Sequence, residues 1–315
     1  MIAVVIPYFQ REPGVLRKAL ASVAAQRGCR QPIEVLVVDD ASPVRAAGEV
    51  GTMPSVRVVT QSNSGPGAAR NTGLDNLHPD TRLVAFLDSD DEWSPDHLAR
   101  AEAALGAGHD FYFADHFQLG QTVGAFARGG RIRPAEHAPL PGAEGLHAYR
   151  GDMLDQIIRG NVIGTSTVVY DARRFPAQRF RVEFTNAGED YLFWMDLARV
   201  GARCCFSSQV EATYGRGVNV YSGAGWGTEQ HMLRVHNELR FKKTVAREFE
   251  LGDEQRALIR THVAALRQAF AGDLLHRLSH RQSTSTALLL AHLKLDPLSY
   301  LQLPATVWAK LVRRA

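Results

Sequence analysis

Apolar strands and helical segments alternate along the first 117 residues, and this alternation constrains the fold more than any other feature. β-Branched, apolar runs lie at residues 2–7, 33–42, 56–61, 82–88 and 110–117. The segments between the runs either repeat apolar residues at helical spacing or pass through a Gly-rich turn into a short helix. Because such units of roughly thirty residues are typical of βαβ crossovers, the sequence predicts an α/β fold with a mostly parallel central sheet and flanking helices.

The rest of the chain is less regular. Residues 120–150, rich in Gly, Pro, Arg and His, indicate a long loop or lid. A further strand is expected at 166–171 and a helix at 187–201 that ends near Gly201. The helix after the fourth strand is expected to have Ser94 as its N-cap and Pro95 at its first position. From about Thr228 onward the chain is expected to be helical.

Composition limits the class of protein. The chain has 315 residues, 45% of them hydrophobic, which is enough for a sizeable core. It contains no apolar run of the length that spans a membrane, and its first ten residues lack the features of a secretory signal. Its three cysteines form neither a disulfide framework nor a zinc-binding pattern. We therefore expect a protein of the reducing cytosol.

Charge is unevenly distributed. Residues 256–315 carry a net charge of +7 and residues 1–255 a net charge of −4. A basic end on an acidic body suggests contact with an anionic membrane or with nucleic acid. Near the end of the chain, apolar residues repeat at helical spacing beside basic ones, which fits either an amphipathic helix at a membrane interface or a helix docked on the core. They are Leu303, Val307, Trp308, Leu311 and Val312, with Lys310, Arg313 and Arg314.

Acidic residues follow two of the predicted strands. Asp39 and Asp40 end the second, and Asp88, Asp90 and Asp91 follow the fourth. In parallel sheets ligands bind beyond the carboxyl ends of the strands, so both clusters are expected at one crevice. The D-x-D turn could hold a divalent cation together with a diphosphate, or it could be a solvated loop. The first pair could bind a base or ribose, or form an Asx-turn or helix cap.

Two further motifs carry charged residues. Arg70, in "NSGPGAARNTG", could pair with a phosphate or with one of the acids, or lie on the surface. Glu189 and Asp190 begin a predicted helix, where a carboxylate either favours the helix dipole or acts as a general base. No G-x-G-x-x-G motif follows the first strand, which argues against a dinucleotide site.

Five segments in order resemble a known family. "VVIPYFQ", "VVDDAS", "NSGPGAARNTGL", "FLDSDDEW" and "GEDYLFW" together are similar to family 2 glycosyltransferases of the GT-A fold, which build bacterial exopolysaccharides and surface glycans. The resemblance covers roughly residues 1–200. It implies an inverting transfer of a sugar from a nucleotide diphosphate, most often UDP, to a hydroxyl, with Mn²⁺ or Mg²⁺ as cofactor.

The resemblance also implies roles for residues near the donor nucleotide. Pro7 and Tyr8 would line the nucleotide pocket through backbone contacts, and Glu12 lies just beyond them. Asp39 would contact the base. Arg70 would stand near the base and the phosphates.

Other implied roles concern the reacting groups. Asp88 would meet the ribose, with Ser89 in the same donor-binding turn, and Asp90 would bind the metal. Asp190 would be the catalytic base. The family's common "VYN" is "YFQ" here, so the resemblance gives no role for Gln10.

Residues for the acceptor are expected further along the chain. Asn161, Thr165 and Ser166 could bind sugar hydroxyls or be ordinary turn residues, and Glu189 lies beside the implied base. Trp226 could stack on a sugar or hold a loop in place. Two histidines on the predicted C-terminal helices, at positions 231 and 236, could approach the metal or be solvated.

The resemblance and the residue patterns together give one prediction for the whole chain. Residues 1–227 would form a catalytic domain, with a nucleotide-binding half at 1–115 and an acceptor half at 116–227. Residues 228–315, which lie beyond the resemblance, would form a helical extension that could touch the inner face of the cytoplasmic membrane. The partners would be a nucleotide-sugar donor and a glycan or lipid-linked acceptor, without nucleic acid. The alternatives are a sugar-nucleotide nucleotidyltransferase and a non-catalytic nucleotide- or glycan-binding module.

Overall fold

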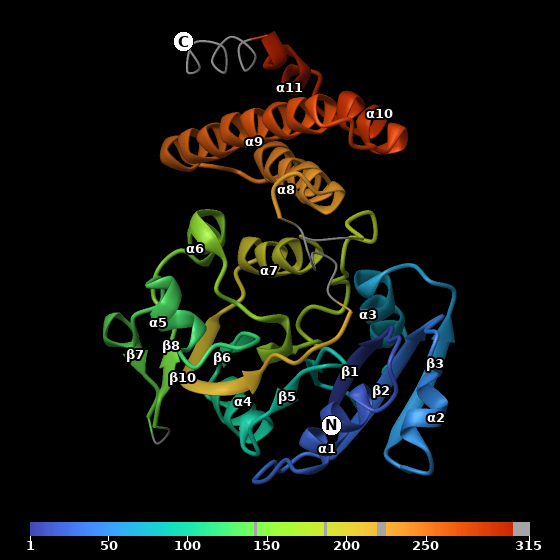
Figure 1. Ribbon diagram of the computed structural model, residues 1–315. Helices are drawn as coiled ribbons and strands as arrows, with labels where there is room; N and C mark the ends of the chain where they lie inside the picture. The colour runs from blue at the N-terminus through green and yellow to red at the C-terminus, as the bar shows by residue number, and fades with distance from the viewer. Residues whose placement is uncertain (142–143, 186–187, 219–224, 305–315) are drawn as a thin grey trace. The chain divides into compact units, whose positions relative to one another are not determined.

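The computed structural model describes residues 1–141, 144–185, 188–218 and 225–304 (Figure 1). Its contacts group these residues into two compact units. The first unit comprises Met1–Thr185 and Glu189–Val218, and the second consists mainly of the described residues from 225 onward. Each unit is described by itself below.

The first unit is built on a mixed sheet of ten strands within the described residues, in the order β3-β2-β1-β4-β9-β6-β10-β8-β7, with β5 paired to β10. The predicted strands are confirmed as β1 (Ile2–Tyr8), β2 (Ile33–Asp40), β3 (Val56–Gln61), β4 (Leu83–Phe86) and β6 (Phe111–Phe117). The first four are parallel. The remaining strands are β5 (Glu92–Trp93), β7 (Ala138–Pro139), β8 (Leu146–Ala148), β9 (Val169–Asp171) and β10 (Cys204–Thr213).

The short strand β9 divides the sheet. It runs antiparallel to β4 on one side and to β6 on the other, whereas β6 and β10 are parallel. The helical turn Thr165–Thr167 stands just before β9. Consequently, residues near 165 lie beside the carboxyl end of β4, about eighty positions away in the sequence.

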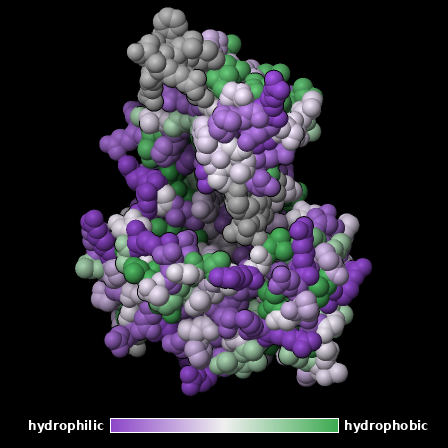
Figure 2. All heavy atoms as spheres, in the orientation of Figure 1, coloured by the Kyte–Doolittle hydropathy of each residue, from purple (hydrophilic) through white to green (hydrophobic). Residues whose placement is uncertain are grey.

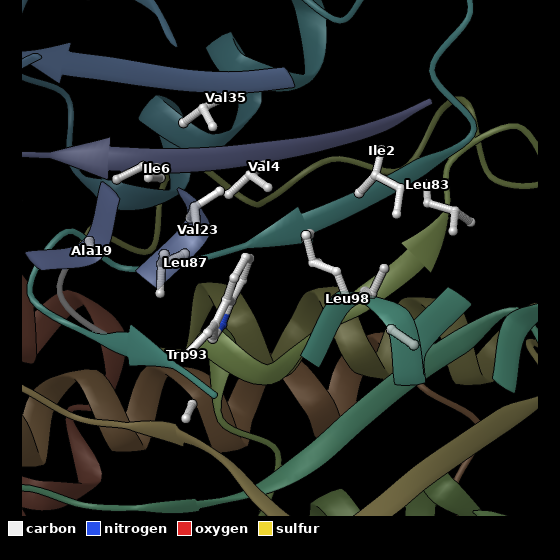
Figure 3. Close-up of a cluster of buried hydrophobic side chains, with 14 of the residues drawn as sticks. Ile2, Val4, Ile6, Ala19, Val23, Val35, Leu83, Leu87, Trp93 and Leu98 are labelled. Carbon is white, nitrogen blue, oxygen red and sulfur yellow. The ribbon is translucent and has the colours of Figure 1, made fainter. Parts of the chain in front are cut away.

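Helices pack on both faces of the sheet. The described helices of this unit are α1 (Val15–Ala24), α2 (Ala46–Val50), α3 (Pro66–Asp75), α4 (His97–Gly106), α5 (Ala125–Gly129), α6 (Met153–Gly160) and α7 (Glu189–Arg199). Val4 and Ile6 of β1 belong to the same core cluster as Leu16 of α1, seen in part in Figure 3. Val5 points to the other face because side chains alternate along a strand. There Gly73 of α3 packs so closely that a Cβ would lie 2.4 Å from Val5 Cγ1.

Two sequence predictions in this unit are wrong. Helix α4 begins at His97 with Asp96 as N-cap, not at Ser94 and Pro95. The reason is tertiary, since the Ser94 N–H donates to the carbonyl of Glu211 in β10 and so continues the β5–β10 pairing. Residues 120–150 are also more ordered than a plain loop, because they contain α5 and the β7–β8 hairpin, which pairs with β10.

The second unit is helical, as predicted, with α8 (Glu229–Glu248), α9 (Asp253–Ser279), α10 (Thr286–Leu295) and α11 (Leu298–Leu301). The Thr228 hydroxyl caps α8 by accepting from the N–H of His231. Met232 and Phe270 are fully buried in the core between α8 and α9. His231 is bonded to Asp273 through Nδ1 at 3.1 Å and is largely buried, so it is not a solvated helical histidine.

The predicted amphipathic segment around Val307 and Trp308 lies outside the described residues. Within the described part of the chain, every helix is too short or too polar to cross a bilayer. The cysteines 29, 204 and 205 are free thiols, as their spacing predicts.

Candidate active site

The turn after β4 gathers carboxylates that repel one another. Asp88, Asp90 and Asp91 follow the strand within five residues, and the N–H of Asp91 donates to the carbonyl of Asp88 at 3.0 Å. Burial, and then the charge of Asp88, raise the pKa of Asp90 to about 6. The same two causes, together with Asp90, raise the pKa of Asp91 well above its usual range. The turn therefore holds more negative charge than its surroundings neutralise.

Ser166 ties this turn to the segment before β9. Its hydroxyl donates to Asp91 Oδ2 at 2.5 Å and accepts from the N–H of Asp88 at 3.0 Å. Its carbonyl accepts from the indole N–H of Trp93. Ser166 is fully buried, and these bonds use its polar groups within the protein. It is therefore not available to a sugar, contrary to one of the sequence expectations, and instead positions the D-x-D turn.

Arg70 is the cation nearest to these acids. Its side chain, from α3, donates to Asp88 Oδ1 at 2.6 Å and to Glu189 Oε1 at 3.3 Å, so it joins the turn after β4 to the start of α7. The residue is only 3% exposed, and its guanidinium lies 5.3 Å from the centre of the Phe180 ring. Of the alternatives for Arg70, pairing with the acids is therefore confirmed and a surface position is wrong.

Of the two acids that begin α7, Glu189 is buried and Asp190 is partly buried, and the pKa of each is raised. Burial, and then the neighbouring Asp190, raise the pKa of Glu189 to about 7 despite Arg70. Burial likewise raises the pKa of Asp190. Asp190 accepts from the N–H of Tyr191 at 2.8 Å and from the Thr165 hydroxyl at 3.3 Å.

A pocket of about 490 Å³ opens beside these acids, entirely within the first unit. Asp88 and Asp190 both contribute to its wall, as do Asn161 and Thr165, two of the residues expected at an acceptor site. The other lining residues are His116, Gln118, Ala125, Arg128, Gly129, Arg131, Val162, Ile163, Gly164, Tyr191 and Tyr214. A ligand hydroxyl bound in this pocket would lie near the carboxylate of Asp190, whose raised pKa means a greater affinity for a proton.

The acids after β2 have different surroundings. Asp39 accepts from the backbone N–H groups of Ser42 at 2.7 Å and Ala46 at 2.9 Å, which forms a turn and caps α2. Asp40 accepts from the N–H groups of Ser64 and Gly65, which lie just before α3. Both acids therefore bind backbone donors ahead of a helix, and each retains lone pairs for a ligand.

The loop after β1 connects the carboxyl end of β2 to that of β4. Tyr8 is 1% exposed, and Pro7 before it is buried in β1. Gln10 donates from Nε2 to Ser89 Oγ at 3.0 Å and from its backbone N–H to Ser42 Oγ at 2.8 Å. Gln10 therefore links the D-x-D turn to the turn after β2. Glu12 is exposed at the start of the following bend.

Sequence reasoning missed the second wall of the pocket. His116 is the penultimate residue of β6, and Gln118 follows that strand. Arg128 and Arg131 come from α5 and the residues after it, and Tyr214 follows β10. No local motif marks these residues, since β6 and β10 bring them together. Trp226, also expected near the acceptor, belongs to the second unit, where its ring contacts those of His231 and His276.

The D-x-D turn suits a divalent cation bound jointly with a ligand. Among the described residues, no group of three or more His, Cys, Asp or Glu side chains is arranged to hold a metal ion alone. Asp88 and Asp90, by contrast, form the kind of carboxylate pair that holds Mg²⁺ or Mn²⁺ when phosphates supply further oxygens. The raised pKa of Asp90 reflects a negative charge that such a cation would stabilise.

Comparison with known proteins identifies the family. The sequence profile described as "Glycosyl transferase family 2" matches residues 3–166, which is just over half of the chain. The chain belongs to glycosyl transferase family 2. It is 33% identical over 254 residues to the succinoglycan biosynthesis protein ExoW of Rhizobium meliloti (strain 1021), a match that covers 75% of each protein.

Solved structures give the same fold. The chain superposes on S. aureus TarS 1-349 in complex with UDP-GlcNAc with a TM-score of 0.56 and 18% identity, over 88% of this chain and 72% of TarS 1-349. The mannosyltransferase PcManGT from Pyrobaculum calidifontis, in complex with GDP-Man and Mn²⁺, gives a TM-score of 0.57 and 16% identity, over 98% and 84% of the two chains. The predicted family and the GT-A fold are therefore confirmed.

Proposed function

We propose that this glycosyltransferase moves a sugar, with inversion, from a nucleotide-diphosphate donor to a hydroxyl of a glycan or lipid-linked glycan during polysaccharide assembly. Asp190 carries the proposal, because it is a partly buried carboxylate with a raised pKa in a pocket that also contains Asp88. The names of ExoW, TarS with UDP-GlcNAc and PcManGT with GDP-Man support this class of reaction. A hexosyltransferase that uses a UDP-sugar is the specific form we propose.

Asp190 would act as the general base. A carboxylate out of water has a greater affinity for a proton than a solvated one, which suits it to accept the proton of an attacking hydroxyl. Thr165 and the N–H of Tyr191 hold the carboxylate in a fixed orientation. Glu189 already accepts from Arg70, so Asp190 is the better placed of the two to receive a proton from the pocket.

The donor would bind along the carboxyl ends of β1, β2 and β4. Pro7, Tyr8, Glu12 and Asp39 would surround the nucleotide. Arg70 would hold the turn that presents Asp88 and Ser89 to the ribose and the phosphates. These assignments rest on the family motifs and on the Gln10–Ser89 bond that joins the two strand ends.

A divalent cation would be held by Asp90 with Asp88. When bound, Mn²⁺ or Mg²⁺ neutralises charge that builds up on the departing diphosphate. The chain's own contribution is a fixed turn, since the Ser166 hydroxyl binds the N–H of Asp88, which begins the D-x-D segment, and the carboxylate of Asp91, which follows it. Asn161, Thr165 and Glu189 are proposed on the acceptor side. For Trp226, in the second unit, stacking on a sugar is a separate proposal.

For domain organisation we propose a catalytic domain at 1–227, with its nucleotide half at 1–115 and its acceptor half at 116–227. We further propose an extension at 228–315 that touches an anionic membrane on the cytoplasmic side.

Figure 2 shows hydrophobic residues gathered over the end of the second unit that carries α10 and α11. Leucines 290, 293, 298 and 301 are 45–70% exposed there. If they insert into a bilayer, replacing all four with serine should abolish co-sedimentation with vesicles that contain anionic lipid. Unchanged sedimentation would contradict this part of the proposal.

Donor binding can be tested without knowing the acceptor. We would measure the melting temperature with UDP, GDP, CMP and dTDP, each with and without Mn²⁺, for the wild type and for Asp90→Asn. One nucleoside diphosphate should raise the melting temperature only when Mn²⁺ is present, and the variant should lose this effect. A lack of any shift with all four nucleotides would count against the proposed function.

A further inference from the structure

One wall of the active-site pocket carries two solvent-exposed arginines, Arg128 and Arg131. Arg128 donates to the amide oxygen of Gln118 at 2.9 Å, and Arg131 donates to the carbonyl of Arg159 at 2.8 Å. Among the described residues, neither guanidinium has a carboxylate within ion-pair distance, although both line the pocket that contains Asp190. Two cations with neutral partners at a pocket wall form a ready site for an anion.

The guanidinium of Arg131 lies at the end of α6. It packs against the backbone at Gly160, where the absence of a side chain leaves room for it, and it donates to the carbonyl of Arg159. Its position therefore joins the segment after α5 to the end of α6 at the pocket wall.

His116 gives a second, independent indication of a ligand. It is only 3% exposed, yet its Nδ1 atom has no hydrogen-bond partner among the described residues. The ring lines the same pocket and stacks on Tyr214 with centroids 4.7 Å apart. Burial lowers the pKa of His116, so the imidazole is neutral at pH 7. A buried polar nitrogen without a partner is rare and costly, and a polar ligand would satisfy it.

We propose that Arg128 and Arg131 bind an anionic group of the acceptor, a phosphate or a carboxylate, while a hydroxyl of the same acceptor faces Asp190. The inference rests on the proposed function and narrows it to acidic acceptors. Such a group belongs either to an acidic sugar or to the phosphate that links a glycan to its lipid. The arginines follow β6, whereas the donor motifs follow β1, β2 and β4, which assigns them to the acceptor rather than to the donor diphosphate.

The test uses the full chain without nucleotide and three probes that differ in charge. Methyl β-glucuronide supplies a carboxylate, glucose 1-phosphate supplies a phosphate, and methyl β-glucoside is neutral. Affinities would be measured by calorimetry for the wild type and for the double variant Arg128→Gln/Arg131→Gln. The matched control is Arg133→Gln, an exposed arginine paired with Glu136 and absent from the pocket wall.

At least one anionic probe should bind about tenfold more tightly than the neutral glucoside, and the double variant should lose that difference. The control should bind like the wild type. Preference for glucuronide would indicate an acidic sugar, and preference for glucose 1-phosphate a phosphate-linked acceptor. Equal affinity for all three probes, or an unchanged preference in the double variant, would overturn the inference.

Nucleotide titrations on the same samples separate this inference from the proposed function. The double variant should bind the nucleoside diphosphate with Mn²⁺ as the wild type does. Weakened nucleotide binding would assign the arginines to the donor and overturn the inference, while leaving the proposed function intact. Conversely, normal probe binding in a protein that binds no nucleotide would defeat the proposed function and leave the anion site standing.

Discussion

Two parallel strands of this glycosyltransferase end in aspartates, but the two clusters differ in how their charge is balanced. Asp39 and Asp40, after β2, accept bonds from four backbone N–H groups that shape the starts of α2 and α3. After β4, Asp90 and Asp91 are held next to Asp88, and burial with mutual repulsion raises the pKa of both. The first cluster stabilises local structure, and the second is a strained arrangement that a ligand would relieve.

The difference shows that the same sequence signal can have two physical outcomes. An acid at a strand end is structural when nearby backbone donors satisfy its oxygens, as they do for Asp39. It is a candidate for function when burial and like charges leave its ionised form poorly compensated, as they do for Asp90. Substitutions in the two clusters should therefore have opposite effects on stability.

The largest effect is expected at Arg70, the cation on which the second cluster depends. Arg70→Met should lower the free energy of unfolding by about 3 kcal/mol at pH 8, because Asp88 and Glu189 lose their partner. The loss should shrink at pH 5, where Glu189, with its pKa of about 7, is protonated. Urea unfolding at pH 8 and pH 5 measures the free energy of unfolding of both proteins. Arg133→Met, which breaks an exposed pair, should cost less than about 1 kcal/mol, and an equal loss in both variants would contradict the prediction.

A smaller loss is expected in the first cluster. Asp40→Ala should destabilise the protein by about 1–3 kcal/mol, since the N–H groups of Ser64 and Gly65 and the amide of Gln61 lose their acceptor. The matched control is Asp75→Ala, an exposed acid paired with Arg179, which should change little. If Asp40→Ala proves as stable as the control, the structural role of this cluster is wrong.

Asp90→Asn should act in the opposite direction. The pKa of Asp90 is raised from 3.8 to about 6, so its contribution to stability is greatest below pH 4 and is lost as the pH rises through 6. In metal-free buffer the variant should therefore be more stable than the wild type by on the order of 1–2 kcal/mol at pH 8, and equal to it near pH 4. Melting curves in EDTA across this range provide the measurement. A variant that is less stable at pH 8 would mean that Asp90 is compensated after all.

Much of the nucleotide-proximal half could be predicted because its signals are local. The apolar runs of β1, β2 and β4 and the Gly-rich start of α3 are each complete within a few residues. These signals predict the parallel sheet and place both acid clusters at its carboxyl edge. Local patterns therefore predict the strands and helices, but they do not predict how the charge of each acid cluster is balanced.

The rest of the site depends on contacts that are distant in sequence. Ser166 reaches Asp91 across 75 positions only because β9 inserts beside β4. Ser94 is not the N-cap that the sequence predicts, because its N–H donates to the carbonyl of Glu211 in β10. Arg128 and His116 come to the pocket through α5 and the end of β6, and no motif in a single sequence marks them. A helix or strand period cannot reveal such pairings.

The proton-accepting role of Asp190 is the central claim, and hydrolysis of the donor by water tests it most directly. With the nucleotide sugar that binds, ¹H NMR would follow the anomer released by the wild type and by Asp190→Asn, beside calorimetric binding of the same donor. We predict release of the inverted anomer, and a fall of about 10²-fold or more in the variant with donor affinity unchanged. Release of the retained anomer, or full activity in Asp190→Asn, would contradict the account.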